Sequence, residues 1–144
     1  MAKILVVDDD KPILEVVKTI LEKEGYDVEI ISHWADVFEK IKNYKPDLVI
    51  LDIFIEEADG RVICKDLKKS KATTHIPVIL FSVTKRLEDY TKDSNAQGYL
   101  KKPFNTTELI DIVKNFAANT RKASYNIMIL KLFLISGILR KWQT

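Results

Sequence analysis

The sequence has few of the residues that mark several common protein classes. A single cysteine, Cys64, leaves no internal disulfide pair, so we expect a small core residue at this position. Only four glycines and four prolines occur in 144 residues, which excludes collagen-like and low-complexity chains. The net charge is only +2, which gives no basis for nucleic-acid binding by this chain. These absences indicate an ordinary globular chain whose core needs no disulfide or structural metal.

Targeting and membrane-spanning patterns are also missing. The N-terminus begins directly with a strand pattern, so we expect no signal peptide and a cytoplasmic location. The longest apolar run, 127–139, is shorter than the roughly 20 residues that a spanning helix needs. It is also interrupted by Lys131 and followed by Arg140 and Lys141. We therefore expect no membrane span.

What the sequence does contain is a regular alternation of strand and helix patterns. Short runs rich in Val, Ile and Leu predict buried strands at 4–7, 28–31, 48–51, 78–81 and 99–100. Apolar residues at helical spacing predict helices from Pro12 to Gly25, Ala35–Asn43, Arg61–Lys68, Lys85–Asp93 and Thr106–Ala118. This alternation predicts an α/β fold with a parallel sheet and helices on both faces.

The C-terminal part does not fit this alternation. The polar residues Asn119-Thr120-Arg121-Lys122 predict a break at the end of a domain spanning 1–119. The extension, 120–144, is too short for the usual winged-helix output module. We expect it to form an additional apolar helix in a homodimer contact. Folding back on its own domain, lying on a membrane surface and forming an inter-chain strand remain alternatives.

Polar side chains follow successive predicted strands. Asp8 and Asp9 follow the first strand, Asp52 ends the third, Ser82 ends the fourth, and Lys102 follows the fifth. The carboxyl ends of parallel strands share one edge of a sheet, where such folds bind ligands. Three carboxylates there would repel one another unless a cation or phosphoryl group uses them. Oxygen ligands suit Mg²⁺, and a hydroxyl and an ammonium suit phosphate oxygens, so the set predicts phosphoryl-transfer chemistry.

Each of these residues also has a simpler interpretation. The three acids Asp8-Asp9-Asp10 are favourable at the start of a helix. Asp52 is a common residue type in turns, and Ser82 can bond to its own backbone. Lysines such as Lys102 are usually solvated. The combined placement at successive strand ends favours the functional interpretation.

Five motifs resemble the receiver domain of two-component response regulators. They are Ile4-Leu-Val-Val-Asp-Asp-Asp10, Asp47-Leu-Val-Ile-Leu-Asp52, Asp59-Gly60, Val78-Ile-Leu-Phe-Ser82 and Tyr99-Leu-Lys-Lys-Pro-Phe104. The resemblance spans about residues 3–118, with the motifs in the right order and spacing. It implies a doubly wound, flavodoxin-like sheet of five parallel strands in the order 2-1-3-4-5.

The resemblance also implies a role for each matching residue. Asp52 corresponds to the phosphoacceptor. Mg²⁺ would be held by Asp8, Asp9, Asp52 and the backbone carbonyl of Phe54. Ser82 and Lys102 would contact the phosphoryl group. The peptide bond between Lys102 and Pro103 is expected to be cis. Tyr99 would be the aromatic residue whose rotation accompanies the switch.

The implied partners are those of a phosphorelay. The phosphodonor would be a sensor histidine kinase or a histidine phosphotransfer protein, and the target a downstream protein. The chain would catalyse only its own phosphorylation and dephosphorylation. Three positions depart from the common pattern: Glu56 stands where proline is frequent, Val83 replaces a small residue, and Phe54 with Thr84 occupies the positions that tune hydrolysis.

Three other functions compete with a phosphorylated receiver. A pseudo-receiver that never takes phosphate is favoured mildly by Val83. A flavodoxin-like FMN carrier conflicts with the acidic loop after the first strand, because a phosphate prefers amides and hydroxyls. A phosphohydrolase would resemble Asp-x-Asp at the nucleophile, and Phe54 replaces the second acid. We interpret His33 and His75 as surface residues away from the strand ends, and expect Trp34 to pack at the start of the second helix.

Overall fold

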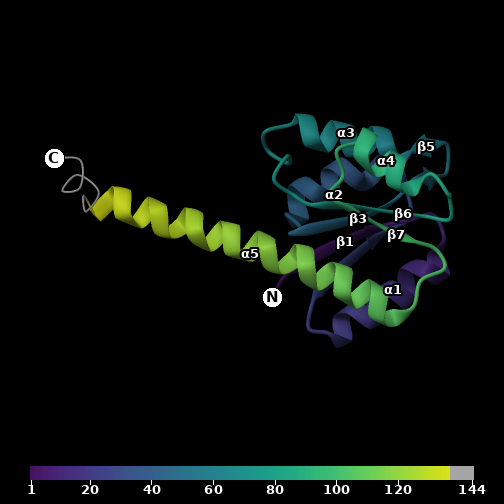
Figure 1. Cartoon of the computed structure of the whole chain (residues 1–144), viewed down its shortest axis with the longest axis horizontal. Helices are drawn as coiled ribbons and strands as arrows, with labels where there is room; N and C mark the ends of the chain where they lie inside the picture. The colour runs from purple at the N-terminus through teal and green to yellow at the C-terminus, as the bar shows by residue number, and fades with distance from the viewer. Residues whose placement is uncertain (137–144) are drawn as a thin grey trace.

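Five parallel strands form the centre of the molecule (Figure 1). The computed structural model describes residues 1–136, with side chains for 1–118 and 125–135. The strands are β1 (Lys3–Val7), β2 (Asp27–Ile31), β3 (Leu48–Asp52), β6 (Val78–Ser82) and β7 (Gly98–Lys101). Their order, β2-β1-β3-β6-β7, is the predicted 2-1-3-4-5 arrangement, and every neighbouring pair is parallel. The predicted doubly wound fold is confirmed.

Helices cover both faces of the sheet. They are α1 (Lys11–Lys23), α2 (Val37–Tyr44), α3 (Gly60–Lys69), α4 (Leu87–Asp93) and α5 (Thr106–Ser136). Alternate strand residues point to opposite faces. Ile4 and Val6 pack in a core with α1 and α5, whereas Leu5 and Val7 pack in a second core with α2, α3 and α4. The predicted role of Cys64 as a buried core residue is confirmed.

Side chains cap the starts of two helices. The side chain of Asp10 accepts a hydrogen bond from the backbone N–H of Ile13 (3.3 Å), and Pro12 lies in the first turn of α1. At α5, the side chain of Asn105 accepts from the N–H of Glu108 (2.8 Å), and the Glu108 carboxylate accepts in return (3.3 Å). These caps start α1 and α5 close after β1 and β7.

Several details differ from the sequence-based expectations. A short antiparallel hairpin, β4 (Phe54–Ile55) with β5 (Ala58–Asp59), follows β3 and was not predicted. Phe38, an apolar residue within the predicted helix Ala35–Asn43, is exposed, because Val37 and Ile41 lie one turn apart and form the buried stripe of α2. Trp34 lies in a short 3₁₀ helix, Trp34–Asp36, that leads into α2, and its side chain remains largely exposed.

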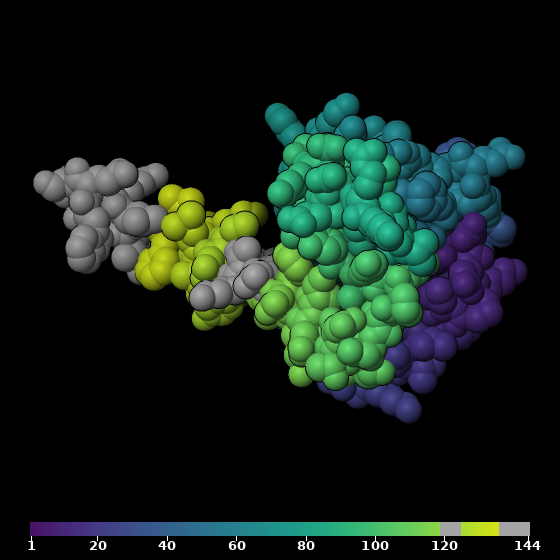
Figure 2. Space-filling model, turned by 45° about the vertical axis from the view of Figure 1, so that its right-hand side comes forward, coloured from purple at the N-terminus to yellow at the C-terminus, as the bar shows by residue number. Residues whose placement is uncertain are grey.

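The predicted break at 119–122 is wrong, because α5 continues through it to Ser136 without interruption. Asn, Thr, Arg and Lys are polar but do not stop a helix as Gly and Pro do, and α5 contains neither of those two residues. The extension is therefore a continuation of α5 rather than a separate helix, and it projects away from the α/β body (Figures 1 and 2). The rest of the predicted extension, residues 137–144, lies outside the residues that the structure describes.

A membrane span is not found in the described part of the chain. Within residues 1–136, every helix is too short or too polar to cross a bilayer.

Candidate functional site

The structure brings the predicted acidic residues together at the carboxyl edge of the sheet. Asp8 and Asp9 directly follow β1, and Asp52 is the last residue of the neighbouring strand β3. Ligand atoms of all three carboxylates lie within 4.8 Å of one another. Asp8 and Asp52 are buried, whereas Asp9 is exposed and gives the site an open side.

Lys102 balances part of this negative charge. Its Nζ atom lies 2.5 Å from Oδ2 of Asp8 and 3.5 Å from Oδ2 of Asp52. The ammonium also lies 4.3 Å from the centre of the Phe81 ring, which packs beneath it. Since Asp8 also accepts a hydrogen bond from the N–H of Asp10 (2.9 Å), its buried carboxylate is held at both oxygens. One lysine thus faces two buried acids and can balance the charge of only one, and Asp52 is the less closely paired of the two.

The pKa of Asp52 reflects this incomplete pairing. Burial of the carboxylate is the largest cause of the shift, and the neighbouring Asp8 adds to it, so that the pKa of Asp52 is raised from 3.8 to about 7. Lys102 and the N–H of Phe54 act in the opposite direction. A charged Asp52 is therefore poorly solvated and lacks sufficient positive charge, which favours binding of a cation beside it.

Asp9 is positioned by a contact that sequence reasoning missed. The backbone N–H of Glu56 donates to Oδ2 of Asp9 (3.0 Å), although Glu56 belongs to the loop that follows β3. The carboxylate of Glu56 in turn lies 2.6 Å from Nδ1 of His33. The interpretation of His33 as a residue away from the strand ends is therefore wrong. His33 follows β2, whose carboxyl end lies beside that of β1, and the hairpin turn reaches across to meet it.

The donor set fits a magnesium ion. The three carboxylates are hard oxygen ligands, they come from two adjacent strand ends, and one of them faces solvent. Mg²⁺ prefers such ligands and retains several waters, which the exposed side of Asp9 permits. Among the described residues, the cluster consists of carboxylates and includes no cysteine or histidine, so it does not resemble a site for zinc or copper.

Ser82 lies on the strand next to the acidic cluster, and Tyr99 lies on the strand beyond it. Ser82 ends β6, is buried, and its Oγ accepts a hydrogen bond from the N–H of Thr84 (3.3 Å). Tyr99, on β7, is 41% exposed. The peptide between Lys102 and Pro103 is cis, as the family resemblance implies.

Two large apolar side chains next to site residues in the sequence are exposed. Phe54 is 56% exposed and Val83 is 65% exposed. Phe54 follows Asp52 by two residues, and its N–H lies 3.4 Å from Oδ1 of Asp52. Val83 directly follows Ser82. Neither side chain is therefore part of the core.

Gly60 is a further residue of the site that the sequence suggested only as a turn. Its N–H donates to the carbonyl of Ile53 (2.7 Å), and α3 begins there. A Cβ atom at this position would lie 2.0 Å from the backbone oxygen of Asp52. Only glycine allows the start of α3 to approach the phosphoacceptor candidate this closely.

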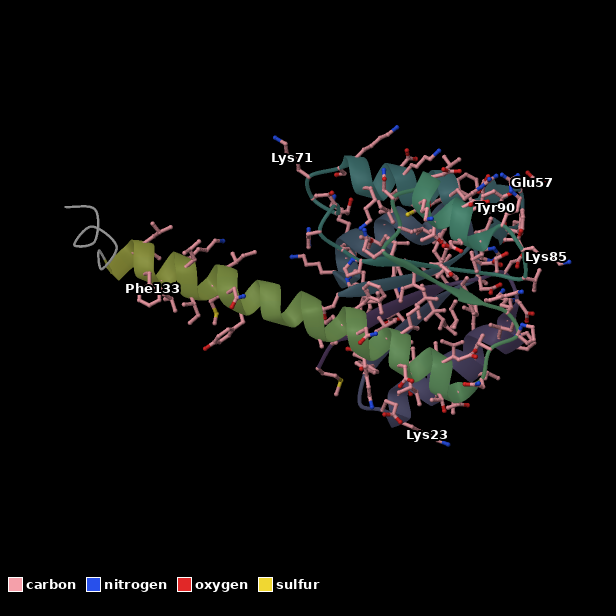
Figure 3. All side chains as sticks on the ribbon, viewed as in Figure 1. Lys23, Glu57, Lys71, Lys85, Tyr90 and Phe133 are labelled. Carbon is pink, nitrogen blue, oxygen red and sulfur yellow. The ribbon has the colours of Figure 1, made fainter. Side chains whose placement is uncertain are left out.

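The carboxyl edge of the sheet lies opposite the end from which α5 leaves the body. Figure 3 shows Glu57, in the hairpin turn, and Lys85, in the loop after β6, at that edge of the molecule. The same view shows Phe133 on the far part of α5, well away from them. The site and the α5 extension are therefore separate features of the molecule.

Comparison with known proteins agrees with this architecture. The sequence profile of the response regulator receiver domain matches residues 4–114. This chain belongs to the receiver domain family of two-component response regulators.

Individual relatives show the same relationship. The DNA-binding dual master transcriptional regulator RpaA of Synechocystis sp. is 32% identical over 122 residues, which cover 83% of this chain and 51% of the relative. The chain thus spans about half the length of that relative. A CheY-like receiver domain protein from Methanospirillum hungatei has a TM-score of 0.77 and 28% identity, covering 85% of this chain and 98% of its own. NtrX from Brucella abortus has a TM-score of 0.78 and 27% identity, covering 90% of this chain and 30% of its own.

Proposed function

We propose that this chain is a phosphorylatable receiver in which Asp52 accepts a phosphoryl group. The observation that carries this proposal is the position of Asp52, which is buried beside Asp8 and Lys102 and has a pKa raised to about 7. A carboxylate with only a structural role would be stabilised by close pairing with the lysine. Here the lysine lies nearer to Asp8, which leaves Asp52 as the less neutralised acid at an open edge.

The transfer is a nucleophilic displacement at phosphorus. When Asp52 is deprotonated, one of its Oδ atoms donates an electron pair to the phosphorus atom of a phosphohistidine. An O–P bond forms as the N–P bond breaks, and the electron pair of that bond leaves with the imidazole. Lys102 neutralises charge on the transferred oxygens, and the hydroxyl of Ser82 donates a hydrogen bond to one of them.

The residues that would hold a metal are also present. Asp8, Asp9, Asp52 and the carbonyl of Phe54 are the proposed protein ligands of Mg²⁺. When bound, Mg²⁺ supplies positive charge to the phosphoryl oxygens and reduces the repulsion between them and the carboxylates. The N–H of Glu56 orients Asp9 for this role.

The proposed organisation is a receiver domain, 1–119, followed by an extension, 120–144. The proposed donors are a sensor histidine kinase or a histidine phosphotransfer protein. A downstream protein would recognise the surface near Ser82 and Tyr99 after it rearranges around the phosphorylated Asp52. We retain the prediction that this chain does not bind nucleic acid, because its net charge is only +2.

The direct test is labelling with acetyl phosphate and Mg²⁺, followed by intact-protein mass spectrometry. We expect one added phosphoryl group, which Asp52→Asn abolishes and Asp9→Asn strongly reduces. Asp66→Asn, a change at an exposed acid on α3, serves as the matched control and should label normally. Undiminished labelling of Asp52→Asn would refute the proposal.

A pseudo-receiver remains the second candidate, and one observation favours it. Asp8 and Lys102 already pair with each other at 2.5 Å without a phosphoryl group. A wild-type chain that binds a downstream partner but takes no phosphate from acetyl phosphate or from any of a panel of kinases would establish this alternative.

A further inference from the structure

The far part of α5 exposes an unusual amount of apolar surface. Eight large apolar side chains between residues 125 and 135 are between 42% and 84% exposed. They are Tyr125, Ile127, Met128, Leu130, Leu132, Phe133, Leu134 and Ile135. Lys131 is the one residue in this stretch that carries a formal charge. Soluble monomers rarely expose a continuous patch of this kind, so it marks a contact surface.

The faces of α5 show where this contact begins. Residues separated by 18 positions, about five turns, point in the same direction. The face of α5 turned away from the body carries Asp111 and Asn115, with Lys114 at its margin, where the ammonium lies 3.9 Å from the carboxylate of Glu24 at the end of α1; all three are exposed and polar. Eighteen positions later the same face carries Ile129, Leu132 and Phe133. The outer face thus changes from polar to apolar once the helix has left the receiver body, so a partner covers the extension but not the receiver half.

The spacing of this outer face suits a second helix. Tyr125, Ile129 and Leu132 are separated by four and three residues, which is the a/d spacing of a coiled coil. In this register Ile129 occupies an a position and Leu132 a d position, the combination that favours two parallel strands. Lys131 then lies at a c position, away from the seam, and remains in solvent.

The available area is sufficient for a modest interface. In a two-helix pair the seam and its flanking positions would bury Tyr125, Met128, Leu132, Phe133 and Ile135, together with the half-buried Ile129. Half-exposed side chains of this size leave on the order of 80–100 Å² each, so each chain offers roughly 500 Å². Two chains together reach the roughly 1,000 Å² expected of a biological interface.

We propose that a second copy of this chain packs its α5 extension in parallel against the first, through the outer face centred on Ile129 and Leu132. A second extension has the required length and begins at the same level of the helix. Because the outer face points away from the body, the two receivers lie on opposite sides of the pair and do not collide. A helix lying on a membrane requires one strongly polar face, which the extension lacks.

The full-length chain can test this by sedimentation velocity across the micromolar range. We expect a reversible dimer for the wild type and a monomer for Leu132→Glu. Ile127→Glu is the matched control, because Ile127 has the same 55% exposure but lies outside the seam. Val62→Glu, at a 55% exposed position on α3, is a second control. Both controls should remain dimeric, and circular dichroism should show all variants equally folded.

Three outcomes would overturn the proposal. They are a wild type that stays monomeric at every concentration, a Leu132→Glu variant that still dimerises, and an Ile127→Glu variant that dissociates as fully as Leu132→Glu. A monomeric wild type that co-sediments with vesicles of phosphatidylcholine and phosphatidylglycerol would assign the surface to lipid instead. None of these results bears on phosphorylation of Asp52, so the two proposals fail independently.

Discussion

His33 and Glu56 join the end of β2 to the hairpin that follows β3, with Nδ1 of His33 lying 2.6 Å from a carboxylate oxygen of Glu56. With a carboxylate as the acceptor, the ring N–H donates. Glu56 has a positive φ of 54°, and in this conformation its own N–H reaches Asp9. The pair therefore fixes the backbone group that orients an exposed carboxylate of the proposed metal site.

We expect His33→Ala to weaken Mg²⁺ binding. Loss of a group that directly orients a metal ligand typically reduces affinity by about 10–100-fold. His33 acts one residue further away, through the loop, so we expect a reduction below about tenfold. Titration calorimetry with Mg²⁺ measures this without any phosphodonor. His75→Ala, at an exposed position before β6, is the control, and equal affinities in the two variants would show that the contact does not orient Asp9.

The sheet could be predicted from the sequence because buried parallel strands form nearly continuous apolar runs. Val78–Phe81 and Leu48–Leu51 are such runs, and the polar residues that end them mark the edge of the sheet. Asp52 and Lys102 were therefore identifiable as neighbours although 50 residues separate them. Because the strands are parallel, their carboxyl ends lie at one edge of the sheet.

The parts that the sequence did not indicate depend on contacts between distant residues. The His33–Glu56 pair links residues 23 positions apart, and neither residue lies in a periodic pattern. The close approach of Gly60 to Asp52 arises only when α3 folds against the end of β3. The continuation of α5 has a different explanation. The polar residues at 119–122 predict a break, but residues of these types permit a helix, and α5 continues through them.

Asp52→Asn should stabilise the fold at neutral and alkaline pH. The folded-state pKa of Asp52 is about 7, above its ordinary value of 3.8, so the folded chain holds a proton that the unfolded chain releases between these values. Stability is therefore lost as the pH rises from about 4 to about 7. At about 1.4 kcal/mol per pKa unit, this shift of about three units means that the charged Asp52 costs roughly 4 kcal/mol above pH 7.

Urea unfolding at pH 8 and at pH 4 measures this difference. We expect Asp52→Asn to exceed the wild type at pH 8 and to match it near pH 4, since Asp52 is then protonated in the folded chain. Asp66→Asn should show no such divergence. A constant difference between Asp52→Asn and the wild type at both pH values would contradict the raised pKa.

Gly60→Ala should disturb both the fold and the site. The added Cβ would lie 2.0 Å from the carbonyl oxygen of Asp52, a backbone atom that cannot move aside cheaply. We expect a loss of roughly 1–3 kcal/mol in the free energy of unfolding, and slower labelling because the end of β3 is displaced. Gly25→Ala is the matched control: its φ of 90° makes alanine unfavourable, but no atom lies within 4 Å of the added Cβ. That variant should lose stability and still label at the wild-type rate.

Val83→Ala should accelerate labelling by acetyl phosphate. Val83 directly follows Ser82 and is 65% exposed, so it does not support the core, and we expect its side chain to narrow the approach to Asp52. Removing two methyl groups from an exposed position should leave the free energy of unfolding within about 0.5 kcal/mol of the wild type. Initial rates of labelling, with Val62→Ala as the control, would decide the point. Unchanged rates in Val83→Ala would show that the valine does not limit access.

Phe54→Asn should shorten the lifetime of the phosphorylated form. Hydrolysis of the acyl phosphate requires a water molecule aligned with the phosphorus atom, and the ring of Phe54 has no group that can hold one. An asparagine amide at this position, two residues after Asp52, can donate to and accept from such a water. Because Phe54 is 56% exposed, the substitution should not disturb the core. Decay of the phosphorylated protein is measured after removal of acetyl phosphate, with Phe54→Leu as the matched control. Leucine keeps the position apolar and should preserve the wild-type lifetime, whereas equal lifetimes for Phe54→Asn and Phe54→Leu would show that this side chain has no part in orienting water.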